Sequence, residues 1–379
     1  MELALANARI VLPDGVLTGS VLVRDGLIAA IAEGAGVPAG ALDLEGDLLI
    51  PGLIDLHTDN LEKHMTPRPG VTWNPVMAAA THDAQIASGG ITTVYDAICV
   101  GVQGYRRDRR SILHPMVAGV AEAQAAGMLR AEHRLHIRCE VNDPDVVAEF
   151  EEFAGHPLLH FVSVMDHAPG QRQFASIAAY RHHYQKSYGM TDAQLDEDIR
   201  VKTENSLRYA AGNRRRIVEI AASRAIPVAS HDDMTVEHVE ESAALGLVVA
   251  EFPTTIAAAA RSRELGLKVL MGSPNVVRGG SHSGNVAAGE LARLGLLDIL
   301  SSDYVPVSLL HGAFTLADGE HGMDLPAAIA TVTATPAAAA GLGDRGRIAI
   351  GLRADLARVG RHGGLPFVKS LWREGKRVL

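Results

Sequence analysis

The chain has 379 residues, 47% of them hydrophobic, and a formal net charge of -9. A chain of this length buries a large core without disulfide support. The acidic balance argues against nucleic acid or a membrane as partner, although it permits a phosphorylated small molecule. Cys99 and Cys139 are too few for a disulfide framework, and neither a signal peptide nor a membrane-spanning apolar run is evident. We therefore expect a cytoplasmic protein.

Both ends of the chain predict short strands separated by turns. Residues 4–11, 16–23 and 27–32 are apolar runs bounded by Pro13-Asp14-Gly15 and Asp25-Gly26. Strand-like runs return at 347–350, 354–359 and 367–372. We expect residues 1–49 and 345–379 to pair into one small β-sandwich domain.

From residue 50 onwards, strand-like runs alternate with Ala-rich helical stretches. Asn74-Pro75 and Gly89-Gly90 bound the first long helix, and Asp143-Pro144 and Thr191 open later ones. The strand candidates are 50–56, 91–98, 134–141, 159–166, 226–231, 247–252, 268–273 and 298–303. This alternation predicts an α/β fold, a parallel TIM (β/α)8 barrel over residues 50–344. Residues 171–225 are too long for one loop and helix, and we expect a helical insert there.

Polar side chains follow the predicted strands at their carboxyl ends, where barrel enzymes place their chemistry. His57 and Asp59 follow the first strand and point to the same side, as a chelating pair for a divalent metal. The corresponding residues on other strands are Glu140, His167, His231 and Asp303. Each alone is more simply a polar loop residue, but six at corresponding positions predict a metal site. They suffice for two divalent ions, which could be zinc, manganese or iron.

A Gly- and Ser-rich segment after the seventh strand predicts a phosphate-binding loop. Its candidate contacts are Gly279, Gly280, Ser281 and Ser283, because glycines allow close approach and hydroxyls donate hydrogen bonds. Loops after strands seven and eight commonly bind phosphate in barrels. Positive charge could come from Lys63, His64, Arg68, Arg172 and Arg278. Taken alone, the segment fits a flexible loop equally well.

Three other polar or reactive residues are interpreted as structural. His82 and Asp83 lie within a predicted helix, where they would make polar contacts against the barrel. Cys139 neighbours Glu140 on a strand and therefore points to the opposite side, into packing.

These motifs resemble the amidohydrolase superfamily, through residues 51–57 near the start and 351–356 near the end. Longer segments resemble one branch, the diphosphatases of the carbon–phosphorus lyase pathway, at residues 57–64, 67–70, 166–173, 230–233, 272–275 and 302–304. The resemblance implies a distorted TIM barrel with the six metal ligands named above. It also implies hydrolysis of α-D-ribose 1-methylphosphonate 5-triphosphate to the 5-phosphate and pyrophosphate.

The chain departs from the wider superfamily pattern in three ways. The usual His-x-His is His57-x-Asp59, and Glu140 stands in place of a carboxylated lysine. His167 and His231 fall on predicted strands four and five, where the superfamily prefers five and six.

The motifs predict a binuclear metal-dependent phosphohydrolase, and the resemblance implies a phosphorylated sugar as its small-molecule partner. Asp303 is the expected base for water attacking the α-phosphorus, and Lys63, Arg68, Arg172 and Arg278 would neutralise phosphoryl charge. Two alternatives remain. One is a cyclic-amide or N-acyl amidohydrolase, which needs the same activated water, and the other is a catalytically silent scaffold or binding subunit. A homo-oligomer is compatible with the sequence.

Overall fold

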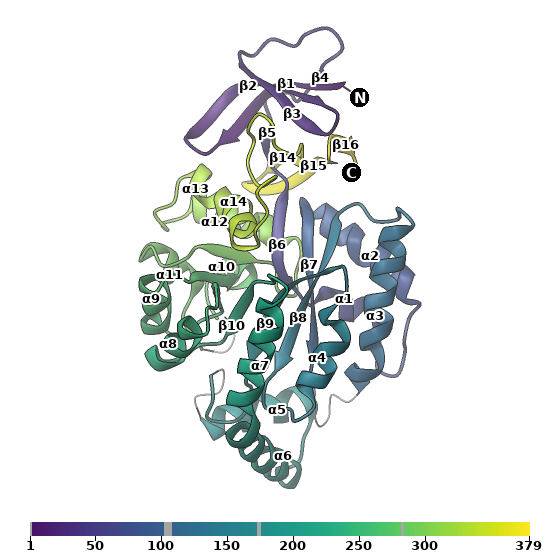
Figure 1. Ribbon diagram of the computed structural model, residues 1–379. Coiled ribbons are helices and arrows are strands. Elements are labelled where there is room, and N and C mark those ends of the chain that lie inside the picture. Colours follow the sequence, from purple (N-terminus) through teal and green to yellow (C-terminus); the bar gives the residue numbers. More distant parts are fainter. Residues whose placement is uncertain (1, 102–107, 173–175, 282–283) are drawn as a thin grey trace. The chain divides into compact units, whose positions relative to one another are not determined.

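The computed structural model describes residues 2–101, 108–172, 176–281 and 284–379 (Figure 1). The chain divides into two compact units. The first unit comprises Met1–Asp96, Ala118–Arg134 and Met271–Leu379, and the second comprises Ala97–Val117 and Leu135–Leu270. Within the described ranges, every helix is too short or too polar to cross a bilayer.

Both ends of the chain build one curled sheet in the first unit, with strand order β16-β15-β14-β5-β1-β2-β3 and β4 paired with β1 (Figure 1). The strands are β1 (Glu2–Leu12), β2 (Gly15–Arg24), β3 (Leu27–Glu33), β4 (Leu42–Asp43), β5 (Leu48–Pro51), β14 (Leu356–His362), β15 (Leu365–Arg373) and β16 (Lys376–Arg377). Alternate residues such as Leu5, Ile10, Leu49 and Trp372 are buried in its core. The predicted pairing of the two chain ends is therefore confirmed.

The predicted strand at 347–350 is wrong. The segment is a loop in which Ile348 is buried and Ile350 is 68% exposed. Gly346 and Gly351 flank it with φ angles of 88° and 86°, which are incompatible with a continuous strand. Gly351 lies in a turn, and its N–H donates to the carbonyl of Ile28 at 2.8 Å.

Eight parallel strands form the second sheet in chain order from β6 to β13. They are β6 (Leu53–Thr58), β7 (Ile91–Val100), β8 (Glu132–Glu140), β9 (Leu159–Met165), β10 (Val228–His231), β11 (Val249–Glu251), β12 (Lys268–Gly272) and β13 (Ile299–Ser301). The first and last strands meet through the Asp303 N–H, which donates to the carbonyl of His57 at 3.0 Å. All eight predicted strands are present, and the sheet is a nearly closed, distorted TIM barrel.

The helices of the barrel region alternate with these strands. They are α1 (Asn60–Met65), α2 (Pro75–Ser88), α3 (Asp108–Ala125), α4 (Val146–Ala154), α8 (Val236–Ala244), α9 (Ile256–Glu264), α10 (Ser273–Arg278), α11 (Ala288–Arg293), α12 (Ser308–Asp318), α13 (Leu325–Ala330) and α14 (Ala334–Ala339). Between β9 and β10 lie α5 (Ile177–Tyr188), α6 (Asp192–Asn205), a π-helical turn η2 (Ser206–Ala210) and α7 (Ala211–Ala222). This is the stretch for which the sequence predicts a helical insert.

Helix starts follow the predicted capping residues in two of three cases. Asn74 Oδ1 accepts from the Met77 N–H at 3.1 Å at the start of α2. Thr191 and Gln194 form a capping box at the start of α6. Asp143 instead accepts from the Asp145 N–H at 2.7 Å in a turn, so α4 begins later than predicted, at Val146.

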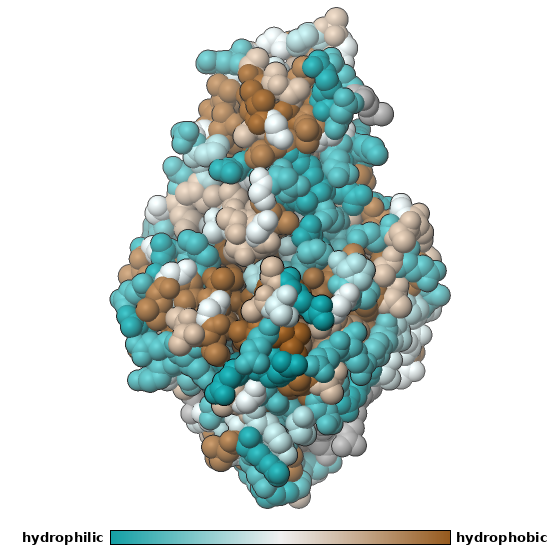
Figure 2. All heavy atoms as spheres, in the orientation of Figure 1, coloured by the Kyte–Doolittle hydropathy of each residue, from teal (hydrophilic) through white to brown (hydrophobic). Residues whose placement is uncertain are grey.

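The terminal sheet exposes several large hydrophobic side chains, Val16, Leu27 and Leu42 among them. On the face shown in Figure 2, hydrophobic residues lie in patches among hydrophilic ones, including one over the region of β1–β3. Isolated apolar side chains on a surface are ordinary and need no function.

Candidate metal centre

The first unit brings together three of the predicted ligands, His57, Asp59 and Asp303. His57 is the penultimate residue of β6, and Asp303 leaves the end of β13 with a φ of 55°. The Asp303 carbonyl accepts from the Asp59 N–H at 2.9 Å and from the Thr58 hydroxyl at 3.0 Å. Aspartate tolerates the left-handed conformation better than most residues, so the turn can place a carboxylate here.

One carboxylate oxygen of Asp59 is available for a ligand. Its Oδ1 is buried and has no hydrogen-bond partner among the described residues. Asp59 precedes α1, yet its side chain does not cap that helix. A buried, unpaired carboxylate oxygen is unfavourable unless a cation neutralises it. Asp59 therefore fits the part of a metal ligand.

The second unit brings together the other three, Glu140, His167 and His231. Glu140 ends β8, His167 follows β9 and His231 ends β10, the fifth barrel strand, as predicted. Glu140 Oε2 lies 2.6 Å from His167 Nδ1, and Glu140 Oε1 accepts from the His167 N–H at 2.8 Å. The rings of His167 and His231 meet edge to face, with centroids 5.7 Å apart.

Asp232 completes this group, although the sequence analysis did not select it. Its Oδ2 is buried without a hydrogen bond and lies 3.6 Å from His167 Nε2 and 3.5 Å from His231 Nε2. The three donor atoms lie within 4.8 Å of one another. Burial alone lowers the pKa of His167, but Glu140 and Asp232 raise it to about 10. The negative charge of Glu140 and Asp232, which stabilises a proton on His167, would also attract a divalent cation. His167, His231 and Asp232 therefore fit a metal site.

Glu251 orients His231. It ends β11 in the second unit, and its Oε2 lies 3.0 Å from His231 Nδ1. This contact leaves His231 Nε2 facing Asp232, with Arg138 Nη2 also 3.2 Å away. Burial lowers the pKa of His231 well below its usual value, against the opposing effect of Glu251, which favours the neutral imidazole that metals bind.

A hydrogen-bond network holds Glu140 in place. Asn142 Nδ2 donates to Glu140 Oε1 at 2.6 Å and to Asp166 Oδ1 at 2.8 Å. The Ser206 hydroxyl from η2 donates to the other oxygen of Asp166 at 2.7 Å. Burial alone raises the pKa of Glu140, but His167 brings it below its ordinary value. The carboxylate is thus kept ionised, as a metal ligand requires.

Two of the predicted phosphate contacts meet at Tyr304, the residue after Asp303. Lys63 from α1 donates to the Tyr304 carbonyl at 2.6 Å, and Arg278 Nη1 lies 3.5 Å from its hydroxyl. Both cations are exposed. This arrangement places positive charge beside the end of β13 in the first unit.

The other predicted basic contacts have different surroundings. Arg172 is buried and ion-paired with Asp233 and with Glu241, the latter at 3.1 Å. Burial lowers its pKa to about 10, assisted by the neighbouring charge of Arg214. Arg68 is exposed and forms an antiparallel bridge with Val71.

The Gly- and Ser-rich loop begins at the carboxyl end of α10. The N–H groups of Gly279 and Gly280 donate to the carbonyls of Val276 and Asn275, at 3.1 and 2.9 Å. Those two amides are thus engaged in ending the helix. Ser281 is half-buried, and the predicted contact Ser283 lies outside the described residues.

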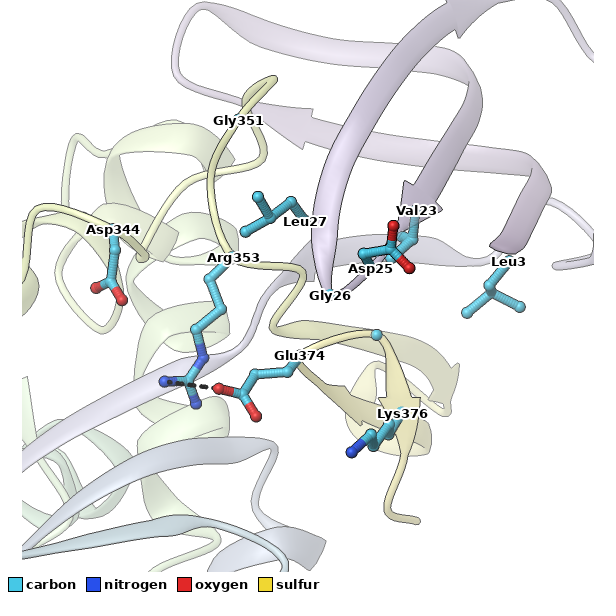
Figure 3. Close-up of a pocket in the computed structure, with 11 residues that line it drawn as sticks. Leu3, Val23, Asp25, Gly26, Leu27, Asp344, Gly351, Arg353, Glu374 and Lys376 are labelled. Atoms are coloured by element: carbon cyan, nitrogen blue, oxygen red, sulfur yellow. Dashed lines mark ion pairs between the residues drawn. The ribbon is translucent and has the colours of Figure 1, made fainter. Parts of the chain in front are cut away.

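A separate pocket opens on the terminal sheet of the first unit (Figure 3). Leu3, Val23 and Leu27 form one side, and Arg353 lies on the other with Glu374 at 3.8 Å. Arg353 also pairs with Glu132 at 2.6 Å, so acidic neighbours already neutralise its charge. The pocket is distinct from the predicted ligands.

A distorted barrel whose strand ends carry imidazoles and carboxylates is typical of metal-dependent hydrolases. The model of the amidohydrolase family matches residues 84–359. The chain belongs to the amidohydrolase family.

Among its relatives, the α-D-ribose 1-methylphosphonate 5-triphosphate diphosphatase of Escherichia coli (strain K12) is 48% identical over 98% of this chain and 99% of its own. An allantoinase from Streptomyces avermitilis is 38% identical, but over only 25% of this chain and 20% of its own. The crystal structure of N-isopropylammelide isopropylaminohydrolase from Burkholderia multivorans has a TM-score of 0.66 at 16% identity, covering 100% of this chain and 98% of that one. This last similarity concerns the fold alone.

Proposed function

We propose that this protein hydrolyses α-D-ribose 1-methylphosphonate 5-triphosphate to the 5-phosphate and pyrophosphate. The main support for this proposal is the 48% identity to the Escherichia coli diphosphatase along 98% of the chain. The matched length includes the residues of both groups described above, together with Lys63 and Arg278. The free thiols of Cys99 and Cys139 support a cytoplasmic location.

We further propose two divalent ions, of zinc, manganese or iron, as cofactors. Their ligands would be the six predicted residues, His57, Asp59, Glu140, His167, His231 and Asp303, with Asp232 as a seventh donor. Support comes from the buried oxygens of Asp59 and Asp232 that have no hydrogen bond and from the carboxylates around His167. Such ions would supply Lewis acidity, which stabilises phosphoryl charge and makes water nucleophilic at neutral pH.

Several side chains near the proposed ligands have a proposed part in this reaction. Asp303 accepts the proton of the attacking water, because its backbone bonds to His57 and Asp59 hold it beside these two proposed ligands. Lys63 and Arg278 stabilise negative charge on the polyphosphate, since both are exposed next to Asp303. Arg68 is a further exposed cation for the same role. Arg172 and the backbone of Gly279 and Gly280 would need to exchange their present partners to bind phosphate. Ser281 and Ser283 are further proposed hydroxyl donors.

Hydrolysis in heavy-oxygen water tests the reaction. Attack at the α-phosphorus predicts that the label enters the ribose 5-phosphate product, with pyrophosphate unlabelled. Mass spectrometry of both products distinguishes attack at the α-phosphorus from attack at the β-phosphorus. Label in pyrophosphate would mean attack at the β-phosphorus and would refute the proposed mechanism.

A cyclic-amide hydrolase is the second candidate. It is favoured by short matches to allantoinases, dihydroorotases and D-hydantoinase, which cover between 23% and 40% of this chain. Opening of dihydroorotate, allantoin or a hydantoin, in the absence of any phosphoryl cleavage, would move the assignment to this class. Elemental analysis of protein purified with added metal should yield about two ions per chain in either case.

A further inference from the structure

A hydrogen-bond network with a fully buried centre in the first unit lies outside the proposed reaction. At its centre is Asp96 on β7, which the sequence analysis did not select. Asp96 Oδ1 lies 2.7 Å from Nε2 of His82 on α2, and Asp96 Oδ2 lies 2.8 Å from Nδ1 of His133 on β8. Three elements are therefore joined through one carboxylate.

The network continues in both directions from Asp96. His133 Nε2 lies 3.3 Å from Asp83 Oδ1, and Asp83 accepts from the N–H groups of Arg130 and Ala131 at 2.9 Å each. At the other end, Asn60 Nδ2 lies 3.0 Å from His82 Nδ1 and donates to Gln85 Oε1 at 2.9 Å. Asn60 is the first residue of α1 and directly follows Asp59.

The donor atoms of His82, Asp96 and His133 lie within 4.8 Å of one another, as in a metal site. Their hydrogen bonds nevertheless argue against an ion. His133 has a carboxylate at each ring nitrogen, and both oxygens of Asp96 have an imidazole. His82 can accept from Asn60 and donate to Asp96 as one neutral tautomer. The network is thus complete by itself, in contrast to the unpaired oxygen of Asp59.

We propose that this network positions Asp59 for metal binding, an inference that rests on the proposed function. It holds the chain on both sides of that residue. Asp96 is the strand partner of Thr58 in the β6–β7 pair, and Asn60 is held through His82. Asp59 itself keeps an unpaired oxygen between these two anchors. The network therefore determines the direction of a ligand that it does not touch.

A contribution to stability does not by itself explain where the network lies. Buried ionic groups are often replaceable by apolar residues of similar volume without loss of stability. A role in geometry explains why two imidazoles and two carboxylates are buried together beside one particular turn. Residues that orient metal ligands typically change metal affinity by roughly 10–100-fold when they are substituted.

The experiment measures binding of Co²⁺ alone to the metal-free protein, by calorimetry and by the visible spectrum of the bound ion. His82→Leu removes both hydrogen bonds of the ring, and we expect Co²⁺ affinity to fall by roughly 10–100-fold with an altered spectrum. His82→Gln keeps a donor towards Asp96 and should recover most of the affinity. Asn60→Ala, which cuts the link to α1 directly, should weaken Co²⁺ binding in the same way and decides the question if His82→Leu does not fold.

Asp355→Asn is the matched control in the same unit. It breaks a buried ion pair with Arg353 at 2.9 Å, just before β14 of the terminal sheet. It should lower the melting temperature yet leave Co²⁺ affinity and spectrum unchanged. A general loss of stability would therefore be separated from a change in ligand geometry.

Three results would overturn the inference. Unchanged Co²⁺ affinity and spectrum in both folded variants would show that the network does not position Asp59. If Asp355→Asn lost as much Co²⁺ affinity as the network variants, their loss would be explained by lower stability alone. If the wild type bound three Co²⁺ ions and the network variants bound two, the network itself would be a metal site. If the wild-type protein binds no metal, the proposed function fails first, so the two failures are distinguishable.

Discussion

Asp303 is the residue at which one substitution can separate chemistry from folding. It has a φ of 55°, a conformation that asparagine also tolerates, and its backbone N–H and carbonyl join it to His57 and Asp59. Asp303→Asn should therefore keep the fold while it removes the proton acceptor. We expect turnover to fall by roughly 10²–10⁴-fold, with a smaller change in KM.

Metal content must be measured in the same Asp303→Asn sample, because Asp303 is also a proposed ligand. A full complement of metal with reduced turnover assigns the loss to proton transfer. Near-normal turnover at full metal content would remove Asp303 from the mechanism.

His133 makes stability depend on pH. Burial alone lowers the pKa of this imidazole, but Asp96 and Asp83 raise it to about 9, above the ordinary value of 6.5. The cation therefore contributes stability fully below about pH 6.5, and the contribution is lost as pH rises through about 9. The shift corresponds to roughly 3 kcal/mol of unfolding free energy.

Comparison of the wild type with His133→Gln isolates this effect. We expect the variant to be less stable at about pH 6, and the difference in unfolding free energy to shrink towards pH 10. Chemical denaturation with a chelator present keeps metal binding out of the measurement. A difference that stays constant across this range would mean that His133 is not a buried cation.

Candidate ligands could be predicted from the sequence where a polar residue directly ends or follows an apolar run. His57, Glu140 and His231 are of this kind, and the barrel orders their strands as expected. Glu251 obeys the same rule at the end of β11 and could have been found by it. Asp232 was missed because it directly follows His231, and strand alternation predicts that neighbouring side chains point to opposite sides. The left-handed φ of 56° at Asp232 interrupts that alternation where the strand ends.

Whole elements were predicted best where hydrophobic periodicity is long. Every barrel strand was found from its apolar run, whereas β4 and β16 have two residues each and are too short for any pattern. The loop at 347–350 has a strand-like sequence, but its neighbouring glycines and its single buried side chain prevent pairing. Such segments are decided by tertiary contacts, which the local sequence does not encode.

The start of α2 provides a test at the scale of one element. Asn74→Ala removes the acceptor for the Met77 N–H and should cost about 1 kcal/mol, whereas Asn74→Asp keeps it. Hydrogen exchange at the first turn of α2 should quicken roughly fivefold in the alanine variant only. Equal exchange in all three proteins would show that the cap does not limit opening of this helix.

The proposed metal centre draws its ligands from nearly the whole length of the barrel sequence. The proposed ligands run from His57 near the end of β6 to Asp303 after β13, so they are far apart in sequence and only the folded chain can gather them. An ion that binds the native state alone raises the free energy of unfolding in proportion to the logarithm of its concentration, by about 2.7 kcal/mol at 100 times its Kd. Metal binding and barrel stability are therefore expected to be coupled.

Removal of metal should accordingly lower the melting temperature of the wild-type protein, and added Mn²⁺ or Zn²⁺ should restore it in a concentration-dependent manner. His167→Asn removes an imidazole that lies against both Glu140 and Asp232, so it should weaken this response. Differential scanning calorimetry with chelator, and then with increasing metal, measures the effect, while NaCl at matched ionic strength controls for screening. Identical melting temperatures in chelator and in saturating metal would contradict a metal centre built from these strands.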